Sequence, residues 1–157
     1  MVALDFSLTL LLAIQLARMS GFSPIITTAS KSNEARLKSL GATHVIDRTL
    51  PLSSLKAVIQ QITDQPVKYG FGAIATPEIQ NALCDDALYD VIALGGQLVL
   101  VGQPAIDEKK SAEDKYIARV FADVQMPAQI EVGRGLYAHI TVMLESGDIR
   151  VRLLKVY

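Results

Sequence analysis

The stretch FSPIITTASKSNEARLKSLGATHVID, residues 22–47, contains the pattern that decides the fold class. An apolar, β-branched run over residues 22–29 predicts a strand, and a helix-forming run over residues 33–40 follows it. Gly41 then stands where a helix C-cap is expected, and residues 43–47 predict a second strand. This succession indicates parallel strands joined by a right-handed helical crossover.

The alternation of strands and helices continues along the chain. Strands are predicted over residues 70–75, 97–101 and 117–124, helices over 52–62, 77–93 and 130–145, and a short β-like tail over 149–156. The apolar run at residues 8–16 predicts a buried helix, because it lacks the basic flank of a secretory signal and is too short to span a bilayer. We therefore expect an α/β, Rossmann-like fold, with a mostly parallel sheet and helices on both faces, as one domain over residues 1–157.

Composition excludes several classes of protein. Half of the 157 residues are apolar and a fifth are charged, which excludes a disordered chain. Lys and Arg number 15 and Asp and Glu number 16, so the net charge of −1 gives no reason to expect nucleic acid or a membrane as a partner. Cys84 is the only cysteine, so an intrachain disulfide is impossible and a cytoplasmic location is expected.

Residues 13–48, AIQLARMSGFSPIITTASKSNEARLKSLGATHVIDR, resemble the cofactor-binding domain of the medium-chain dehydrogenases/reductases. The likeness is to the zinc-independent branch of quinone oxidoreductases and fungal enoyl reductases, where LGATHVID ends a helix and forms the third strand. GGQLVLVG (95–102) resembles the fifth strand, KYIARVFADV (115–124) the sixth and GLYAHITVMLESGDI (135–149) a later helix. The resemblance implies a Rossmann domain for NADP or NAD. In the family this domain is inserted within a GroES-like catalytic domain, which we expect to be absent here, so that the chain is truncated.

The glycine-rich turn of the family has no counterpart in this sequence. It would fall at residues 4–10, which read LDFSLTL, and no glycine occurs before Gly21. Glycine lets the backbone bend tightly and approach the pyrophosphate, whereas leucines would fill that space and Asp5 would add a like charge. Asp5 or Ser7 is expected to cap the helix instead.

The central first strand of such a sheet is also short of residues. Residues 1–3 remain for it, or 2–6 if the turn is abandoned. Without that strand the two flanking strands would each have an unpaired edge. We therefore expect a shortened or rebuilt first strand, a rearranged sheet, or a homodimer in which a sheet edge pairs with a second chain.

The resemblance places candidate cofactor-binding residues directly after the second strand. Ser30, Lys31 and Asn33 stand at the segment that in this family contacts the adenosine ribose and, for NADP, its 2′-phosphate. A hydroxyl and a cation suit that phosphate. The acidic residue that usually marks NAD is absent, so NADP is favoured, with weak binding. Alternatively, Ser30 or Ser32 caps the following helix and Lys31 is solvated, and these roles are compatible with binding.

Three further candidate cofactor-binding residues stand at other strand ends. Arg48 follows the third strand near the adenine side, Thr76 follows the fourth strand and Gly102 the fifth. Exposure at the surface for Arg48, and turn chemistry for Thr76 and Gly102, are the alternatives. The family often has an acidic residue where Gly72 stands in this chain.

No residue is assigned to catalysis or to a metal. His44 and His139 are expected to be structural or exposed, and Asp85 and Asp86 disfavour a thiolate at Cys84. Zinc-site spacing, a nucleophile elbow and a P-loop are all absent.

Three functions remain open, and the substrate is unknown in each. The first is a cofactor-binding domain from an oxidoreductase, with weakened or lost NADP binding and no self-contained catalysis. The second is a non-catalytic, oligomerising interaction module on a degenerate Rossmann scaffold. The third is a reductase that takes its catalytic domain from a second chain. Resemblance of fold does not choose among them.

Overall fold

The computed structural model describes residues 1–4, 8–72, 78–101, 106, 114–120 and 126–151. The chain divides into two compact units, Met1–Phe121 and Ala122–Tyr157. In chain order, the elements of the first unit are β1 (Val2–Leu4), α1 (Leu8–Met19), β2 (Ile26–Ala29), the 3-10 turn η1 (Lys31–Asn33), α2 (Glu34–Leu40), β3 (His44–Asp47), the 3-10 turn η2 (Leu52–Ser54), α3 (Leu55–Ile62), β4 (Tyr69–Gly72), α4 (Glu78–Val91), β5 (Gln97–Val101) and β6 (Tyr116–Val120).

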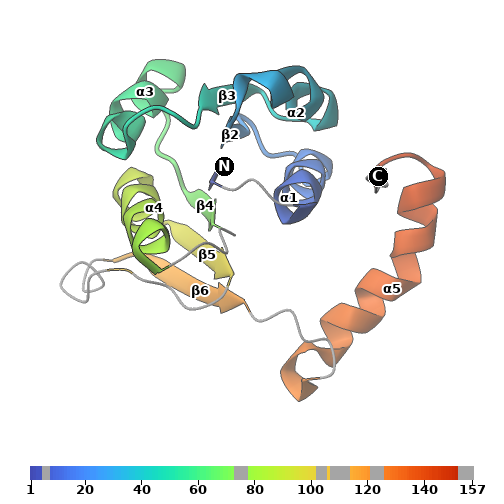
Figure 1. Ribbon diagram of the computed structural model, residues 1–157. Helices are drawn as coiled ribbons and strands as arrows, with labels where there is room; N and C mark the ends of the chain where they lie inside the picture. The colour runs from blue at the N-terminus through green and yellow to red at the C-terminus, as the bar shows by residue number, and fades with distance from the viewer. Residues whose placement is uncertain (5–7, 73–77, 102–105, 107–113, 121–125, 152–157) are drawn as a thin grey trace. The chain divides into compact units, whose positions relative to one another are not determined.

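The first unit is built on one sheet (Figure 1). Among the described residues this sheet has six strands in the order β3-β2-β1-β4-β5-β6. Every neighbouring pair is parallel. The order is that of a doubly wound dinucleotide-binding sheet, in which the chain reverses its winding direction between β1 and β4. The predicted Rossmann-like fold class is therefore confirmed.

The strand at the centre of the sheet, β1, is short. Its middle residue, Ala3, stands opposite Thr27 of β2 and Phe71 of β4. Val2 and Ala3 are both buried. Of the three alternatives for the first strand, the shortened strand is therefore the one that the structure confirms, and three residues suffice to join the two halves of the sheet.

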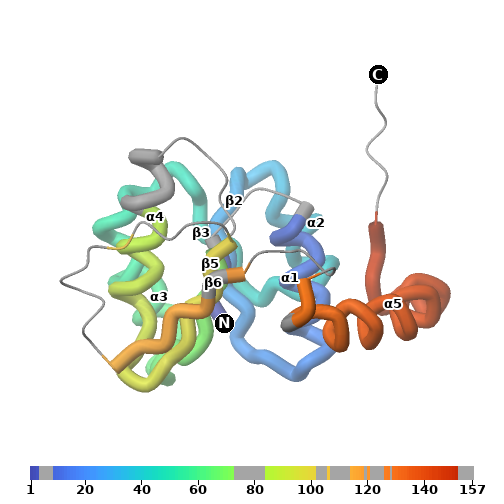
Figure 2. Tube along the Cα trace, turned by 90° about the horizontal axis from the view of Figure 1, so that it is seen from below, coloured from blue at the N-terminus to red at the C-terminus, as the bar shows by residue number. Residues whose placement is uncertain are grey.

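Helices cover both faces of the sheet, α1 and α2 on one side and α3 and α4 on the other (Figures 1 and 2). Two apolar clusters fill the space between the layers. The cluster under α1 and α2 contains Ala3, Leu10, Ile14, Ala17, Ile25, Ala29, Leu37, Leu40 and Ala42. The cluster under α3 and α4 contains Val2, Ile26, Ile46, Leu55, Ile59, Leu88, Tyr89, Val91, Leu98 and Leu100. Because strand side chains alternate between faces, neighbours such as Val2 and Ala3 belong to different clusters.

The strand predicted over residues 22–29 is shorter in the structure, since β2 begins at Ile26. Pro24 has no N–H for a strand ladder. The N–H of Ile25 donates to a side chain, Thr43 Oγ1, at 3.0 Å, and the Ile25 carbonyl accepts from that hydroxyl at 2.9 Å and from the Thr43 N–H at 2.8 Å. A threonine hydroxyl eighteen positions along the chain therefore takes the place of a strand partner for the Ile25 N–H.

The predicted cap at Gly41 is confirmed. Gly41 has φ +124°, and its N–H donates to the carbonyls of Leu37 and Lys38 at the end of α2. A Cβ at this position would lie 2.8 Å from Cδ of Arg18 on α1. Glycine is therefore required for two reasons: residues with a side chain disfavour this φ, and a Cβ would clash with Arg18.

The second unit, as far as the structure describes it, consists of the 3-10 turn η3 (Pro127–Gln129) and α5 (Ile130–Glu145). The helix has the predicted bounds. The β-like tail predicted from residue 149 is wrong in its described part, because Ile149 is buried and its N–H donates to the Met143 carbonyl of α5 at 3.0 Å. Residues 152–156 of that prediction lie outside the described residues. No helix in the described parts of either unit is long and apolar enough to cross a membrane.

Candidate functional site

The candidate site is the edge of the sheet at which β2 and β3 end side by side. The last residues of the two strands, Ala29 and Asp47, are register partners. The N–H of Arg48 donates to the Ala29 carbonyl at 3.0 Å, which ties the connection after β3 to the end of β2. Because ligands of open parallel sheets bind at the carboxyl ends of the strands, Ser30 and Arg48 stand on two adjacent connections of the binding edge.

The segment after β2 is a tight turn. Ser30 is extended and half-buried, and the Asn33 N–H donates to its carbonyl at 2.9 Å to close η1. Neither Ser30, which precedes η1, nor Asn33, the N-cap of α2, makes a side-chain capping bond. Ser30 therefore occupies the N-cap position of η1 without a side-chain capping bond, and Ser32 lies inside η1. The 3-10 turn moves the start of α2 to Glu34 and away from both serines.

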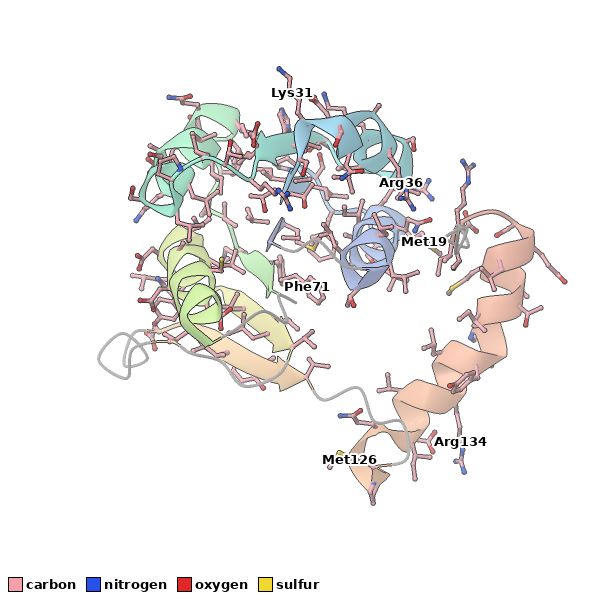
Figure 3. The ribbon with its side chains drawn as sticks, viewed as in Figure 1. Met19, Lys31, Arg36, Phe71, Met126 and Arg134 are labelled. Atoms are coloured by element: carbon pink, nitrogen blue, oxygen red, sulfur yellow. The ribbon has the colours of Figure 1, made fainter. Side chains whose placement is uncertain are left out.

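Lys31 and Arg48 place two exposed cations at this edge. The Lys31 side chain extends outward from the segment between β2 and α2 (Figure 3). Both cations act on the Asp47 carboxyl: its pKa is lowered first by hydrogen bonds from the Thr49 N–H at 2.9 Å and hydroxyl at 2.8 Å, and then by the charges of Lys31 and Arg48. The two cations are therefore close enough to act together on one anionic group.

Asp47 also lies at this edge of the sheet. The sequence predicted it only as the last residue of a strand, with no role in the site. The charges of the same two cations act on its carboxylate, so it competes with a phosphate ligand for them. The signal that could have found it is its position directly before Arg48, at a strand end.

The other candidate residues are less informative. Thr76 and Gly102 lie outside the described residues. Gly72 is buried, and a Cβ there would lie 2.8 Å from Leu100 Cδ2 and 3.4 Å from Leu88 Cδ2. The acidic residue often found at this position in the family would therefore meet two leucines and, at 3.5 Å, the like-charged Asp85 carboxylate.

The residues present fit one end of NADP and not its middle. At the adenosine end, Lys31, Arg48 and the Ser30 hydroxyl supply the charge and the donor that a 2′-phosphate requires. In the middle, β1 ends at Leu4 and α1 begins at Leu8, so only residues 5–7 connect them. Those residues are Asp, Phe and Ser, without the glycine that a pyrophosphate turn uses.

Groups capable of acid–base or metal chemistry are scattered in the described parts of the chain. No cluster of three or more His, Cys, Asp or Glu there could hold a metal ion, so these residues do not fit zinc. The exposed rings of His44 and His139 each make a local bond, at 3.0 Å to Thr43 Oγ1 and 2.8 Å to the Gly135 carbonyl. The pKa of the Cys84 thiol is raised, first by burial and then by the charge of Asp85.

Two surface hollows lie at the opposite, amino edge of the sheet. One has a volume of 480 Å³ and lies where α3 and α4 end. The other has a volume of 280 Å³ and is lined by Met1, Pro24 and Tyr69, at or just before the starts of β1, β2 and β4. Ligands of this fold bind at the carboxyl edge, where Lys31 and Arg48 lie. The candidate site is therefore placed at these two cations and not at the hollows of the amino edge.

Comparison with known proteins identifies the family. A family model described as zinc-binding dehydrogenase matches residues 11–123, which is most of the chain. The chain belongs to this family. No curated protein sequence matches it. This membership confirms the resemblance to the medium-chain dehydrogenases/reductases.

Solved structures of dehydrogenases and reductases share the fold of this family member. Benzyl alcohol dehydrogenase from Acinetobacter calcoaceticus is 26% identical, with a TM-score of 0.62 over 88% of this chain and 39% of its own. A mycobacterial protein, Rv1454c, solved with NADPH, is 19% identical, with a TM-score of 0.76 over 97% of this chain and 47% of its own. The nucleotide-binding subdomain of the enoylreductase domain of PpsC from Mycobacterium tuberculosis is 23% identical, with a TM-score of 0.63 over 96% of this chain and 86% of its own. The chain therefore spans less than half of the two longer proteins and most of the excised subdomain.

Proposed function

We propose that this chain is a nucleotide-binding domain of the reductase type, with weak affinity for NADP(H) and without a catalytic centre of its own. The observation that carries the proposal is the pair of cations, Lys31 and Arg48, on adjacent connections of the carboxyl edge. No acidic residue stands directly at the end of β2, where the sequence reads Ala29-Ser30, and this favours NADP over NAD, because a carboxylate there would accept the ribose hydroxyls of NAD and repel a 2′-phosphate.

The roles of the residues follow from their chemistry. Lys31 and Arg48 would pair with the 2′-phosphate, and the half-buried Ser30 hydroxyl would donate to a phosphate or ribose oxygen. Asn33 would complete the turn that presents them. When NADPH is bound, it supplies the hydride, and a substrate-bearing domain must position the acceptor. The NADPH-bound mycobacterial structure with this fold supports the proposal.

Calorimetric titration of the chain with NADPH and with NADH tests this function. We expect measurable heat with NADPH, with dissociation constants roughly in the high micromolar to millimolar range, and at least about tenfold weaker binding of NADH. Lys31→Met should remove the preference for NADPH. Lys38→Met is the matched control, because Lys38 is a surface lysine already paired with Glu34 at 2.7 Å. Absence of heat with NADPH at millimolar concentration would refute the proposal.

An oligomerising module is the second candidate function, and the exposed edge of the sheet favours it. In the described residues β6 ends the sheet and pairs with β5 alone, and its first residue, Tyr116, is 67% exposed. Unpaired strand edges offer backbone groups to a second chain. A homodimer formed through this edge should appear in light scattering, and Tyr116→Asp should weaken it. A strictly monomeric chain over the whole concentration series would exclude this alternative.

A further inference from the structure

The connection between β1 and α1 lacks the glycines that a pyrophosphate-binding turn uses. The end of β1 is fixed on both sides, because Leu4 stands opposite Thr28 of β2 and Gly72 of β4. The beginning of α1 is fixed by Leu10, which is 2% exposed within the cluster under α1 and α2. The three connecting residues, which include a carboxylate and no glycine, therefore stand between two anchored elements.

The adenosine end of the site has the opposite character. Lys31 and Arg48 are exposed, so a phosphate can reach them without displacing packed side chains. The backbone beneath them is held by the Arg48 N–H bond to the Ala29 carbonyl and by the Asn33 N–H bond to the Ser30 carbonyl. Two cations on a fixed backbone give a charge-assisted contact in which only side-chain freedom is lost on binding.

We infer that this edge binds a nucleotide through its 2′-phosphate and adenosine alone, and that the diphosphate and the nicotinamide half of NADP add no affinity. The inference rests on the proposed function, because it concerns the same site. It makes an adenosine 2′-monophosphate the smallest complete ligand of the chain. A phosphate on the 5′ oxygen would point toward the glycine-free connection and gain nothing there.

Titration of the full chain with three probes separates the contributions: adenosine 2′-monophosphate, adenosine 5′-monophosphate and NADP. We expect the 2′-monophosphate to bind within about threefold of NADP, and the 5′-monophosphate to bind at least about tenfold more weakly. Lys31→Met should weaken the 2′-monophosphate about tenfold or more, whereas Lys38→Met should change it less than about twofold.

Each outcome of these titrations has one meaning. If NADP binds more than about threefold tighter than the 2′-monophosphate, the rest of the dinucleotide contributes, so this inference is wrong while the proposed function stands. If the 5′-monophosphate binds as tightly as the 2′-monophosphate, the site does not select a phosphate at the 2′ position, and the inference is wrong. If neither NADP nor the 2′-monophosphate binds, the proposed function fails and the inference fails with it.

Discussion

The side chain of Arg18, near the end of α1, packs so closely on Gly41 that a Cβ at Gly41 would lie 2.8 Å from its Cδ and 2.9 Å from its Cβ. This contact joins the ends of α1 and α2 on one face of the sheet. Gly41 therefore does two things: it ends α2, as the sequence predicts, and it leaves the space in which the Arg18 side chain packs.

Replacement of Gly41 by alanine is expected to destabilise the chain by roughly 2–4 kcal/mol. Part of the loss comes from φ +124°, and the rest from the contact with Arg18. Gly135→Ala is the matched control: Gly135 lies within α5 with no neighbour near its missing Cβ, so alanine should stabilise by about 0.5–1 kcal/mol. Urea denaturation gives both free energies of unfolding, and equal effects of the two substitutions would contradict this account.

Thr27→Val is expected to stabilise the chain by about 1 kcal/mol. Thr27 is fully buried in β2, and its hydroxyl has no hydrogen-bond partner among the described residues. Valine has almost the same shape and removes the unsatisfied group.

Thr43→Val is the counterpart and should cost about 1–2 kcal/mol, because it leaves the Ile25 N–H without its acceptor, while the Ile25 carbonyl keeps the N–H of Thr43. Both variants are compared by thermal and urea unfolding. Destabilisation by Thr27→Val would show that its hydroxyl is satisfied in solution.

Cys84 is expected to react slowly with iodoacetamide. Burial, and then the Asp85 carboxylate, raise the pKa of this thiol, so the folded chain keeps it protonated at pH values where an unfolded thiol ionises. At pH 8 the folded chain should be alkylated at least about tenfold more slowly than the chain in urea. Asp85→Asn should speed the reaction by removing the second cause. Alkylation of folded and unfolded chains at the same rate would contradict the raised pKa.

The same shift makes stability depend on pH in a definite direction. Because the folded thiol has the higher pKa, the folded state binds the proton more tightly than the unfolded state does. The contribution of Cys84 is therefore fully present below the pKa of the unfolded thiol and is lost as the pH rises above it. Cys84→Ser should flatten this alkaline fall in the urea midpoint.

Asp47→Asn is expected to raise the affinity for adenosine 2′-monophosphate about threefold at low ionic strength. The substitution removes the carboxylate on which the charges of Lys31 and Arg48 act, and it leaves a side-chain oxygen to accept the bonds from Thr49. Asp64→Asn is the control, since Asp64 lines the hollow at the other edge of the sheet. Unchanged affinity in the Asp47 variant would mean that the ligand does not meet these cations.

Much of the fold follows from local sequence patterns. The bounds of β5 and of α5 were predicted to the residue, because each is a strongly apolar or periodic run ended by a turn or a glycine. The start of β2 was missed, because the Ile25 N–H donates to the side chain of Thr43, which only the folded chain brings near. A 3-10 turn after β2 shifts the helix start, so that Ser30 holds the N-cap position of that turn without a side-chain capping bond.

The site was only partly accessible from sequence. Ser30, Lys31 and Arg48 were chosen from a resemblance and from strand ends, and the register of β2 against β3 brings their connections together. Asp47 was not found, because its influence depends on the distance to charges on another connection, and residue spacing does not encode that distance. The amino-edge hollows depend on how helix ends pack, which the pattern of apolar residues does not specify.

The position of β1 has a consequence for how the chain matures. Its three residues leave the ribosome before either of the strands that hold them, so the middle of the sheet stays open until Gly72 has been added. At ordinary rates of synthesis that interval is roughly 4–14 s. Throughout it the apolar side chains of Val2 and Ala3 lack the β4 neighbour that completes their burial in the folded sheet.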